Sequence, residues 1–250
     1  MKRIIFIFSV ILAFNFSVEA ETNLVKKAND LYANGDYQAA ANEYEQVLLK
    51  DGVAPELYFN LGNAYYKSGE VGRSILNYER ALRLYPTYDD AKANLEMAQL
   101  KVVDNVVQVP PFFIKRWISI MMKLLTSNQW FVLSVISLIL TLAAILFFVF
   151  GYTLTYRKLS FYFAVVLLSF TVITGFFSGV RKYQMINHTD AIIMSGAVNV
   201  KSSPDKSGTD LFQLHEGTKV RIKSTLGAWT EIVLGNGNIG WVEDENIEKI

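Results

Sequence analysis

Few side chains in this sequence have the types and spacing that catalysis needs. Histidine occurs only at His188 and His215, and the absence of cysteine excludes thiolate nucleophiles, disulfides and iron–sulfur clusters. The glycines between Gly235 and Gly240 lie between predicted strands and open no helix, so they indicate a turn and not a phosphate loop. Neither a His-x-x-x-His nor a Gly-x-Ser-x-Gly motif is present. We therefore expect a protein that is not an enzyme, with no catalytic residue, metal site or cofactor.

Charge and hydropathy divide the chain into three parts. The formal net charge is +1 and hydrophobic residues make up 52% of the sequence, while the mean hydropathy of +0.24 is too high for an ordinary soluble domain. No acidic residue lies between Arg116 and Lys182, whereas both flanking parts are mildly acidic. Because nucleic-acid binding needs a basic face on a folded domain, we expect no nucleic-acid partner.

Two long uncharged segments in the basic middle part predict a transmembrane hairpin over 129–180. Its helices are expected at about 130–150 and 159–180, each long enough to cross a hydrocarbon layer of about 30 Å. Neither segment shows a polar stripe, which argues against two core helices of a soluble domain. About eight residues would connect them. The Gly175-x-x-x-Gly179 motif fits a contact with the first helix as well as a contact with a second copy.

The first 20 residues have the pattern of a secretory signal peptide. Lys2 and Arg3 precede an apolar run too short to span a bilayer, and Ala20 offers a cleavage site, with an uncleaved anchor as the alternative. An exported first segment followed by two spans predicts a bacterial inner-membrane protein with both flanks in the periplasm. The distribution of Lys and Arg near the spans favours the reverse orientation. We give the signal more weight because it directs the first insertion event.

The segment 105–128 is predicted to be a linker followed by a helix in the membrane interface. Trp117 and Met121 can face lipid, while Lys115, Arg116 and Lys123 can reach the headgroups. Membrane lipid is therefore one expected partner.

The segment 21–104 contains an internal repeat. Residues of the same kind recur 34 positions apart in the pairs Ala28 and Gly62, Gly35 and Gly69, and Tyr44 and Tyr78. The second copy reads Tyr58-x2-Leu61-Gly62-x2-Tyr65 and ends at Pro86. This pattern resembles the tetratricopeptide repeat, in which each unit is a pair of antiparallel helices. Two units and a closing helix after Asp89 predict an all-α solenoid.

The tetratricopeptide resemblance implies a peptide-binding groove along the first helix of each unit. Its residues would be Asn29, Tyr32, Glu56, Phe59, Asn60, Asn63, Tyr66, Asn94 and Met97. Asparagine amides can clamp a bound peptide backbone, and we expect them to point to solvent in the free protein. Asn29 and Asn60 match two positions of a carboxylate clamp of the family, but Val25, Asp90 and Asn94 stand where its basic residues would be. The alternative is an ordinary solvated helix surface.

The segment 187–250 changes to short alternating runs that predict five or six strands of a small all-β barrel. The expected strands are 191–194, 197–201, 219–223, 229–234 and 239–242. The order Val198-Asn-Val, His215-Glu-Gly217, Trp229 and Gly240-Trp-Val242 resembles a bacterial SH3 domain, which implies attachment to peptidoglycan or to peptides. A docking or spacer barrel is the alternative. We expect the indoles of Trp229 and Trp241 to be core or half-core.

The order of signal, repeats, hairpin and SH3-like barrel resembles the BatE family of the Bacteroides aerotolerance (Bat) system. The resemblance implies a multi-domain fold and partners among membrane and periplasmic proteins, including von Willebrand A-domain membrane proteins and a MoxR-type ATPase. One hypothesis is a scaffold whose repeats dock these proteins. The other is an envelope anchor or sensor whose barrel binds peptidoglycan. In both, the repeats and the barrel are expected to fold independently.

Overall fold

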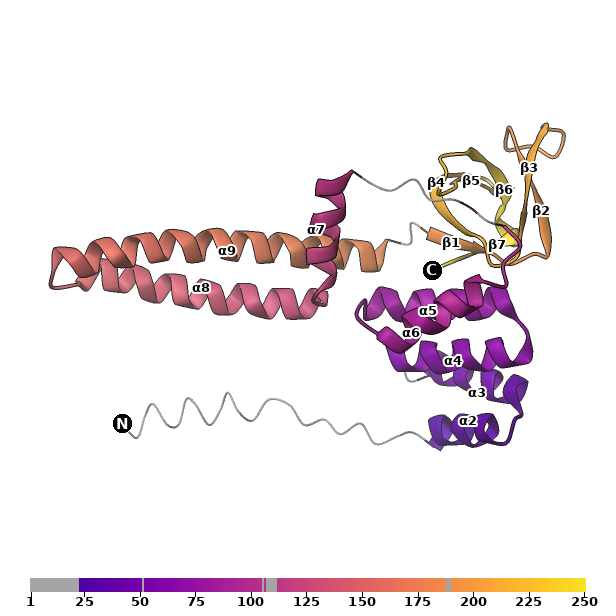
Figure 1. Ribbon diagram of the computed structural model, residues 1–250, viewed down its shortest axis with the longest axis horizontal. Helices are drawn as coiled ribbons and strands as arrows, with labels where there is room; N and C mark the ends of the chain where they lie inside the picture. Colours follow the sequence, from indigo (N-terminus) through magenta and orange to yellow (C-terminus); the bar gives the residue numbers. More distant parts are fainter. Residues whose placement is uncertain (1–22, 51, 105, 107–111, 188–189) are drawn as a thin grey trace.

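The computed structural model describes residues 23–250 except 51, 105, 107–111 and 188–189. The predicted signal peptide lies outside the described residues. Three parts follow one another along the chain: five short helices, an amphipathic helix with a long apolar hairpin, and an antiparallel sheet (Figure 1). We call them the repeat domain (α2 to α6), the hairpin (α8 and α9) with α7 at its base, and the sheet domain (β1 to β7). This is the multi-domain fold class that the sequence predicted.

The repeat domain consists of two helical pairs and a closing helix. Its helices are α2 (Asn23–Ala33), α3 (Tyr37–Lys50), α4 (Pro55–Ser68), α5 (Val71–Leu84) and α6 (Asp89–Gln99). Gly35 and Gly69 adopt φ of +88° and +90°, left-handed conformations that let each pair turn tightly. Pro55 occupies the start of α4, where its missing N–H costs nothing.

Helices α4 and α5 cross closely at Gly62, as the repeat pattern predicted. A Cβ atom at this position would lie 2.7 Å from two ring carbons of Tyr78, so only glycine fits without displacing the ring. The Tyr78 side chain is itself 1% exposed. The crossing therefore fixes the distance between the two helices of the second unit.

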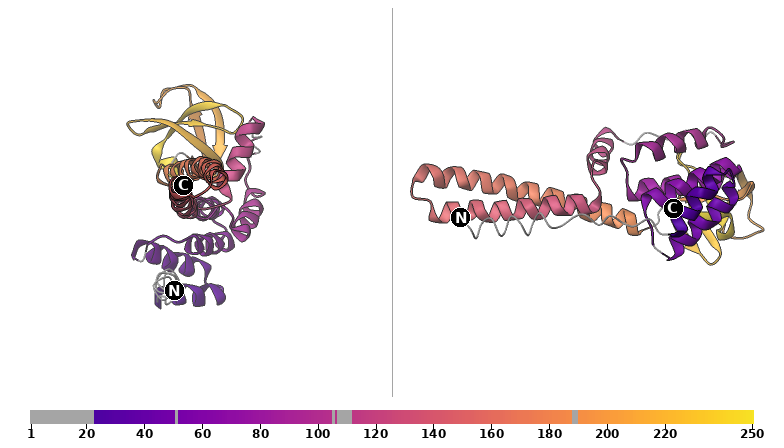
Figure 2. Two further views of the ribbon diagram at one scale, coloured as in Figure 1. Left: turned by 90° about the vertical axis from the view of Figure 1, so that its left-hand side faces the viewer. Right: turned by 90° about the horizontal axis from the view of Figure 1, so that it is seen from below.

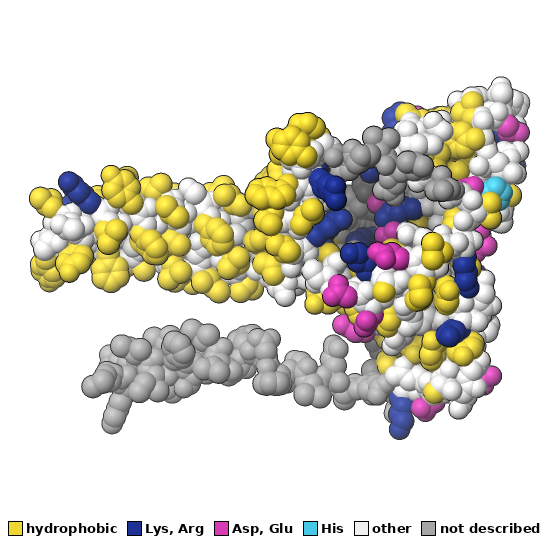
Figure 3. Space-filling model, in the orientation of Figure 1, with side chains coloured by type: hydrophobic (Ala, Val, Ile, Leu, Met, Phe, Trp, Pro, Cys, Tyr) yellow, Lys and Arg dark blue, Asp and Glu magenta, His cyan; other side chains and the backbone are white. Residues whose placement is uncertain are grey.

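The hairpin has the length and composition of two membrane spans. It comprises α8 (Ser127–Phe150) and α9 (Leu154–Ile186), and only 17% and 11% of their most apolar windows are buried against the rest of the chain. Space-filling representation shows apolar side chains over the length of the hairpin face in view (Figure 3). Core helices of a soluble protein would be mostly covered, so the hairpin fits a bilayer.

The turn of the hairpin is shorter than expected, because only Gly151 to Thr153 lie between the two helices. Thr153 accepts a hydrogen bond from the Tyr156 amide at 3.3 Å and starts α9 there. Arg157 belongs to the first turn of α9 and donates through Nε to the Phe148 carbonyl at 3.1 Å. Arg157 and Lys158, which fall between the two expected helices 130–150 and 159–180, are thus helical.

Hydroxyl side chains join α8 to α9, a polar stripe that the sequence analysis missed. Ser127 and Ser178 each donate to the other's backbone carbonyl at 3.0 Å. Ser137 donates to the Leu167 carbonyl at 3.0 Å, and Ser134 to the Thr171 carbonyl at 3.1 Å. Small hydroxyl residues permit close packing and satisfy their own polarity, so hydropathy alone does not reveal them.

Helix α7 (Phe113–Lys123) lies across the base of the hairpin (Figures 1 and 2). Phe113, Trp117 and Ile120 are exposed at spacings that put them on one face, whereas Lys115 lies on the opposite face and Lys123 ends the helix to one side of the apolar face. An amphipathic helix perpendicular to a membrane-spanning hairpin lies parallel to the membrane surface. This geometry suits the predicted interfacial helix.

The corner between α7 and α8 is fixed by two local interactions. The Trp130 indole donates to the Met122 carbonyl at 3.0 Å. Thr126 and Gln129 form a capping box at the start of α8, with each side chain bonded to the other residue's backbone amide. These contacts set the angle at which the interfacial helix meets the hairpin.

The sheet domain contains seven strands, two of which the sequence analysis missed. They are β1 (Asp190–Ile193), β2 (Ala197–Lys201), β3 (Asp210–His215), β4 (Lys219–Leu226), β5 (Trp229–Val233), β6 (Ile239–Glu243) and β7 (Ile247–Lys249). Their order is β3-β2-β6-β5-β4-β1-β7, with antiparallel pairing throughout the described strands. Strands β3 and β7 were not foreseen, because neither has a strict apolar alternation.

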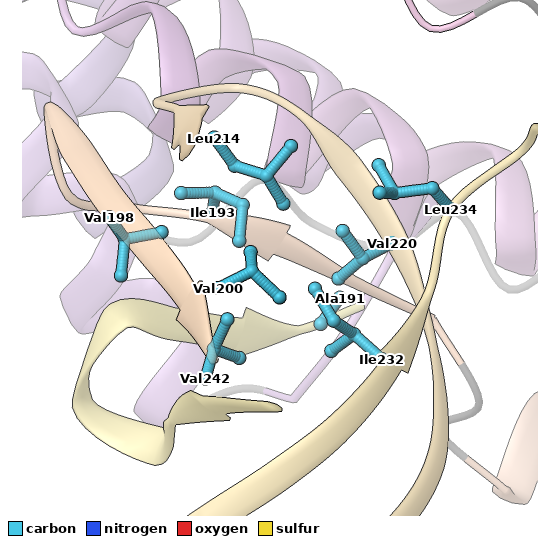
Figure 4. Packing of buried hydrophobic residues seen from close by; sticks show 9 residues of the cluster. All are labelled: Ala191, Ile193, Val198, Val200, Leu214, Val220, Ile232, Leu234 and Val242. Carbon is cyan, nitrogen blue, oxygen red and sulfur yellow. The ribbon is translucent and has the colours of Figure 1, made fainter. Parts of the chain in front are cut away.

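Aliphatic side chains from strands β1 to β6, and from Leu234 directly after β5, fill the interior of the sheet domain (Figure 4). This core comprises Ala191, Ile193, Val198, Val200, Leu214, Val220, Ile232, Leu234 and Val242. Neither Trp229 nor Trp241 belongs to it, and both are partly exposed. The expectation of half-core indoles therefore holds, whereas core positions are excluded.

The repeat and sheet domains share a hydrophobic cluster, so they are not the separate units that the sequence suggested. The cluster joins α5 and α6 to β1 and the residue after β7, and it consists of Ile75, Leu76, Tyr78, Leu95, Ala98, Ile192 and Ile250. The sheet domain covers the open end of the helical stack beside α5 and α6 (Figure 1). It occupies the place where a further helix would otherwise close the solenoid.

Polar contacts surround this shared cluster. Glu216 accepts from the Gly72 amide at 2.8 Å, and a Cβ atom at Gly72 would lie 2.6 Å from the Glu216 side chain. Lys219 donates to Glu79 at 2.7 Å, and Arg80 pairs with Glu248 at 2.9 Å. Residues more than a hundred positions apart thus hold the two domains together at the same end of the hairpin.

Candidate functional site

The nine residues predicted to line a peptide groove lie on the first helix of each repeat unit. Asn29 and Tyr32 are on α2, Asn94 and Met97 are on α6, and the other five are on α4. Asn94 donates to the Asn63 amide oxygen at 2.7 Å, which links α6 to α4 directly. The structure therefore brings the α4 and α6 members together, and binding of a peptide to the row remains a prediction.

Three of the four asparagines have structural partners, contrary to the expectation that all point freely to solvent, and two of them accept from buried tyrosines. Tyr44 donates to the Asn29 amide oxygen at 2.5 Å, and Tyr78 donates to that of Asn63 at 2.8 Å. Both tyrosine rings are buried, and burial raises the pKa of the Tyr78 hydroxyl, which keeps it protonated as a donor. The bonds fix the orientation of these amides.

Asn63 keeps a donor for a ligand. Its Oδ1 atom accepts from both Tyr78 and Asn94, while no acceptor in the described part of the chain meets its Nδ2 atom. Within the same described residues the Asn60 side chain has no hydrogen-bond partner and is partly exposed. An oriented amide donor and a second amide one turn away can bind a peptide carbonyl and amide.

Aromatic side chains flank these amides. Phe59 packs against Tyr88 with ring centroids 5.0 Å apart, and the Lys101 ammonium lies 4.0 Å from the centre of the Tyr66 ring. On α2, Tyr32 packs edge-on against Tyr37 at 5.2 Å. Glu56 on α4 and Met97 on α6 are exposed. The surface thus combines amide donors with aromatic and apolar area, a composition suited to protein ligands.

A second candidate site is a pocket of about 500 Å³ on the sheet domain. Its polar lining includes Asn199, Gln213 and Lys206, and Trp229 forms part of its wall. Gln213 and Asn199 bond to each other at 3.3 Å, and Asn199 donates to Asp210 at 3.1 Å. A partly exposed indole beside amides is a combination that can bind sugars or peptides. The expectation that the Trp229 indole is core or half-core did not indicate that it borders a pocket.

Asp104 makes a cluster of contacts that couples the repeat domain to the sheet domain. It accepts from the His215 amide at 2.6 Å and the Thr218 hydroxyl at 2.7 Å, and its Oδ1 atom lies 2.8 Å from His215 Nδ1. Burial alone would raise the pKa of the carboxyl, but the bonds from Thr218 and His215 hold that pKa below its ordinary value. His215, which looked like a residue before a turn, therefore supports the junction.

The described residues form no cluster of possible metal ligands. In that part of the chain no three His, Asp or Glu side chains gather in a way that could hold a metal ion. The Asp104 carboxylate and the His215 imidazole are engaged in the contact between the two domains.

Comparison with known families agrees with this geometry. Residues 25–89 match the tetratricopeptide repeat. Residues 196–248 match the bacterial SH3 domain. A search of curated proteins finds no significant match to the chain. The chain thus combines tetratricopeptide repeats, which suggest protein–protein interaction, with an SH3-like domain, which suggests cell-wall binding. The sheet domain is called the SH3-like domain from here on.

Proposed function

We propose that this protein is a non-enzymatic adaptor of the bacterial inner membrane whose repeats dock a segment of a partner protein. The observation that supports this most is the oriented Asn63 amide, presented by a buried tyrosine beside Asn60 and an aromatic surface. A row of amides on successive helices can pair with an extended peptide backbone.

The repeats and the SH3-like domain are placed in the periplasm in this proposal. Their mutual packing is compatible only with both lying on one side of the membrane, which two spans between them provide. The N-terminal signal pattern supports the periplasmic side.

The proposed complex is of the Bat type, with a von Willebrand A-domain membrane protein and a MoxR-type ATPase as partners. The order of repeats, hairpin and SH3-like domain supports this assignment, since it resembles the BatE family over nearly the whole chain. In that setting the protein would contribute to a cell-envelope complex linked to aerotolerance.

Substitution at Asn63 and Asn60 tests the docking role. Asn63→Asp keeps an oxygen that accepts from Tyr78 and Asn94 but removes the Nδ2 donor, and Asn60→Ala removes an amide that supports nothing else in the described residues. Each lost hydrogen bond should weaken docking about two- to tenfold. Asn42→Ala, exposed on the second helix α3, is the matched control.

The measurement is co-purification of the von Willebrand A-domain protein with the full-length chain from detergent-solubilised membranes. Loss with both groove variants and retention with Asn42→Ala support docking by the repeats. Full retention with the double groove variant contradicts it.

A second candidate function is attachment to peptidoglycan through the SH3-like domain. The pocket beside Trp229 supports it, because it combines an indole with amide groups on the bacterial SH3-like domain. Full-length protein should then sediment with purified cell-wall sacculi, and Trp229→Ala should reduce the bound fraction. Leu226→Ala, an exposed apolar residue outside the pocket, should leave it unchanged. Equal sedimentation of wild type and Trp229→Ala would speak against a wall site here.

A further inference from the structure

A cavity of about 620 Å³ lies where the hairpin base, α7, the repeat domain and the SH3-like domain meet. Basic side chains from all four parts line it: Arg83, Lys92, Lys123, Arg181, Lys219 and Arg221. In the space-filling view, Lys and Arg side chains gather around the hollow between the hairpin base and the two domains (Figure 3). This junction pocket is distinct from the peptide row and from the pocket beside Trp229.

The acids that line the junction pocket are already paired. Glu79 accepts from Lys219 at 2.7 Å. Asp190 lies 3.7 Å from the Lys219 ammonium and 3.8 Å from Arg221 Nε. Among the described residues, no carboxylate pairs with Lys92, Lys123 or Arg181. The pocket therefore keeps an excess of positive charge from three separate helices, α6, α7 and α9.

Arg181 differs from Lys92 and Lys123 in being buried. The residue is 9% exposed, and within the described chain its buried Nε atom has no hydrogen-bond partner. Its one polar contact there is from Nη1 to the Gln184 amide oxygen at 3.3 Å. A buried guanidinium is costly unless an anion accepts from it, so the geometry leaves a place for an anion that the chain itself does not supply.

The pocket lies at the level of lipid headgroups if the hairpin crosses the membrane. The uncharged segment of α9 from Leu159 to Val180 is long enough to cross a hydrocarbon layer of about 30 Å, and Arg181 follows directly. Lys123 ends α7, the helix that lies across the hairpin base. Arg181 and Lys123 therefore face the pocket at the boundary where phosphate groups concentrate.

We propose that the junction pocket binds the phosphate group of an anionic phospholipid. Arg181 is suited to donate to two phosphate oxygens through its planar guanidinium, and Lys92 and Lys123 add positive charge from the two sides. Leu82 and Met122 provide apolar wall for the glycerol region of the lipid. One lipid bound here contacts the hairpin, the interfacial helix and the repeat domain together, and so sets how the domains sit on the membrane.

Lipid binding by the full-length chain in detergent micelles tests this site. Native mass spectrometry would measure the dissociation constants for phosphatidylglycerol and phosphatidylcholine. We expect phosphatidylglycerol to bind more tightly, Arg181→Gln to weaken it about tenfold or more, and Lys92→Gln or Lys123→Gln to weaken it about fivefold each. Lys182→Gln, exposed one residue beyond Arg181 and outside the pocket, should change it less than twofold.

Lys92→Gln keeps the test informative even if Arg181→Gln does not fold, since Lys92 is exposed outside the membrane-spanning helices. Equal affinity for the two lipids, or an equal loss with Lys182→Gln and Lys92→Gln, would overturn the proposal. If inorganic phosphate at the same concentration as the lipid displaces phosphatidylglycerol, the site binds a soluble anion, and the proposal of a lipid ligand is overturned. If a polyglutamate peptide at equal total charge displaces phosphatidylglycerol, the site binds an acidic protein segment, and the proposal of a lipid ligand is likewise overturned.

Discussion

The Tyr78 hydroxyl donates to the Asn63 amide oxygen at 2.8 Å, and 34 residues earlier Tyr44 makes the same bond with Asn29. The period of the repeat thus appears as a repeated hydrogen bond from the second helix to the first. Each bond satisfies a buried hydroxyl and fixes the amide that is proposed to meet a ligand. Stability and binding are therefore coupled at these residues.

Tyr78→Phe should lower the free energy of unfolding by about 0.5–1.5 kcal/mol, because the ring stays buried while one hydrogen bond is lost. Docking to the proposed von Willebrand A-domain partner should weaken as well, since the Asn63 amide is then held by Asn94 alone. Denaturant unfolding gives the first quantity and co-purification the second. Tyr85→Phe, at an exposed ring, should change neither.

Gly62→Ala should destabilise the protein by about 1–3 kcal/mol, because the new Cβ atom would lie 2.7 Å from the Tyr78 ring. The loss should affect both domains, since Tyr78 belongs to the cluster that also contains Ile192 of the SH3-like domain. In a chain with Trp117 and Trp130 replaced by Phe, the remaining tryptophans Trp229 and Trp241 report on the SH3-like domain. Thermal unfolding followed by their fluorescence and by helical circular dichroism should show one shared transition. Gly196→Ala, where a Cβ atom meets nothing within 4 Å, is the control. Two separate transitions would contradict the shared core.

Acidification below about pH 4 should weaken the contact between the domains through Asp104. Its folded-state pKa lies below the ordinary value of 3.8, so its contribution to stability is present above that value and is lost as the pH falls through the folded-state pKa. Asp104→Asn should lose about 1.5–3 kcal/mol at neutral pH and flatten the acid limb of the stability profile. Asp30→Asn, an exposed carboxylate on α2, should leave that profile as in wild type.

The proposed orientation predicts opposite labelling of two engineered cysteines in a chain that has none of its own. In intact cells with a permeable outer membrane, an impermeant thiol reagent should modify Asp205→Cys, which is exposed in the SH3-like domain. Lys158→Cys, at the far end of the hairpin, should react only after the inner membrane is broken. The reverse pattern would place the domains in the cytoplasm, as the distribution of basic residues favours.

Periodic local patterns predicted much of this fold. The 34-residue spacing revealed the helical pairs, and uncharged length revealed the hairpin, because both depend on neighbours close in sequence. Strands β3 and β7 were missed. Strand β3 lacks a strict apolar alternation, and β7 has only three residues and forms a strand because it pairs with β1. The hydroxyl stripe of the hairpin was missed because serine and threonine lower hydropathy only slightly.

The candidate site was predicted in part. The repeat pattern placed all nine residues on first helices, yet it could not show that Asn29 and Asn63 accept from buried tyrosines of the second helices. The contact between the repeat domain and the SH3-like domain could not be predicted from the sequence for a similar reason. Ile75 and Ile192 lie more than a hundred positions apart in segments assigned to two different domains, and nothing local indicates that they pack together.

The shared cluster of the two domains also imposes an order of assembly. Ile75, Leu76 and Leu95 are synthesised well before Ile192 and Ile250, and the whole hairpin lies between them in the sequence. The end of the helical stack therefore stays uncovered until the hairpin has been made and the last strands emerge. In the proposed membrane topology, insertion of the hairpin thus precedes completion of the repeat domain, and a chain interrupted before β1 leaves the apolar end formed by α5 and α6 exposed to chaperones and proteases.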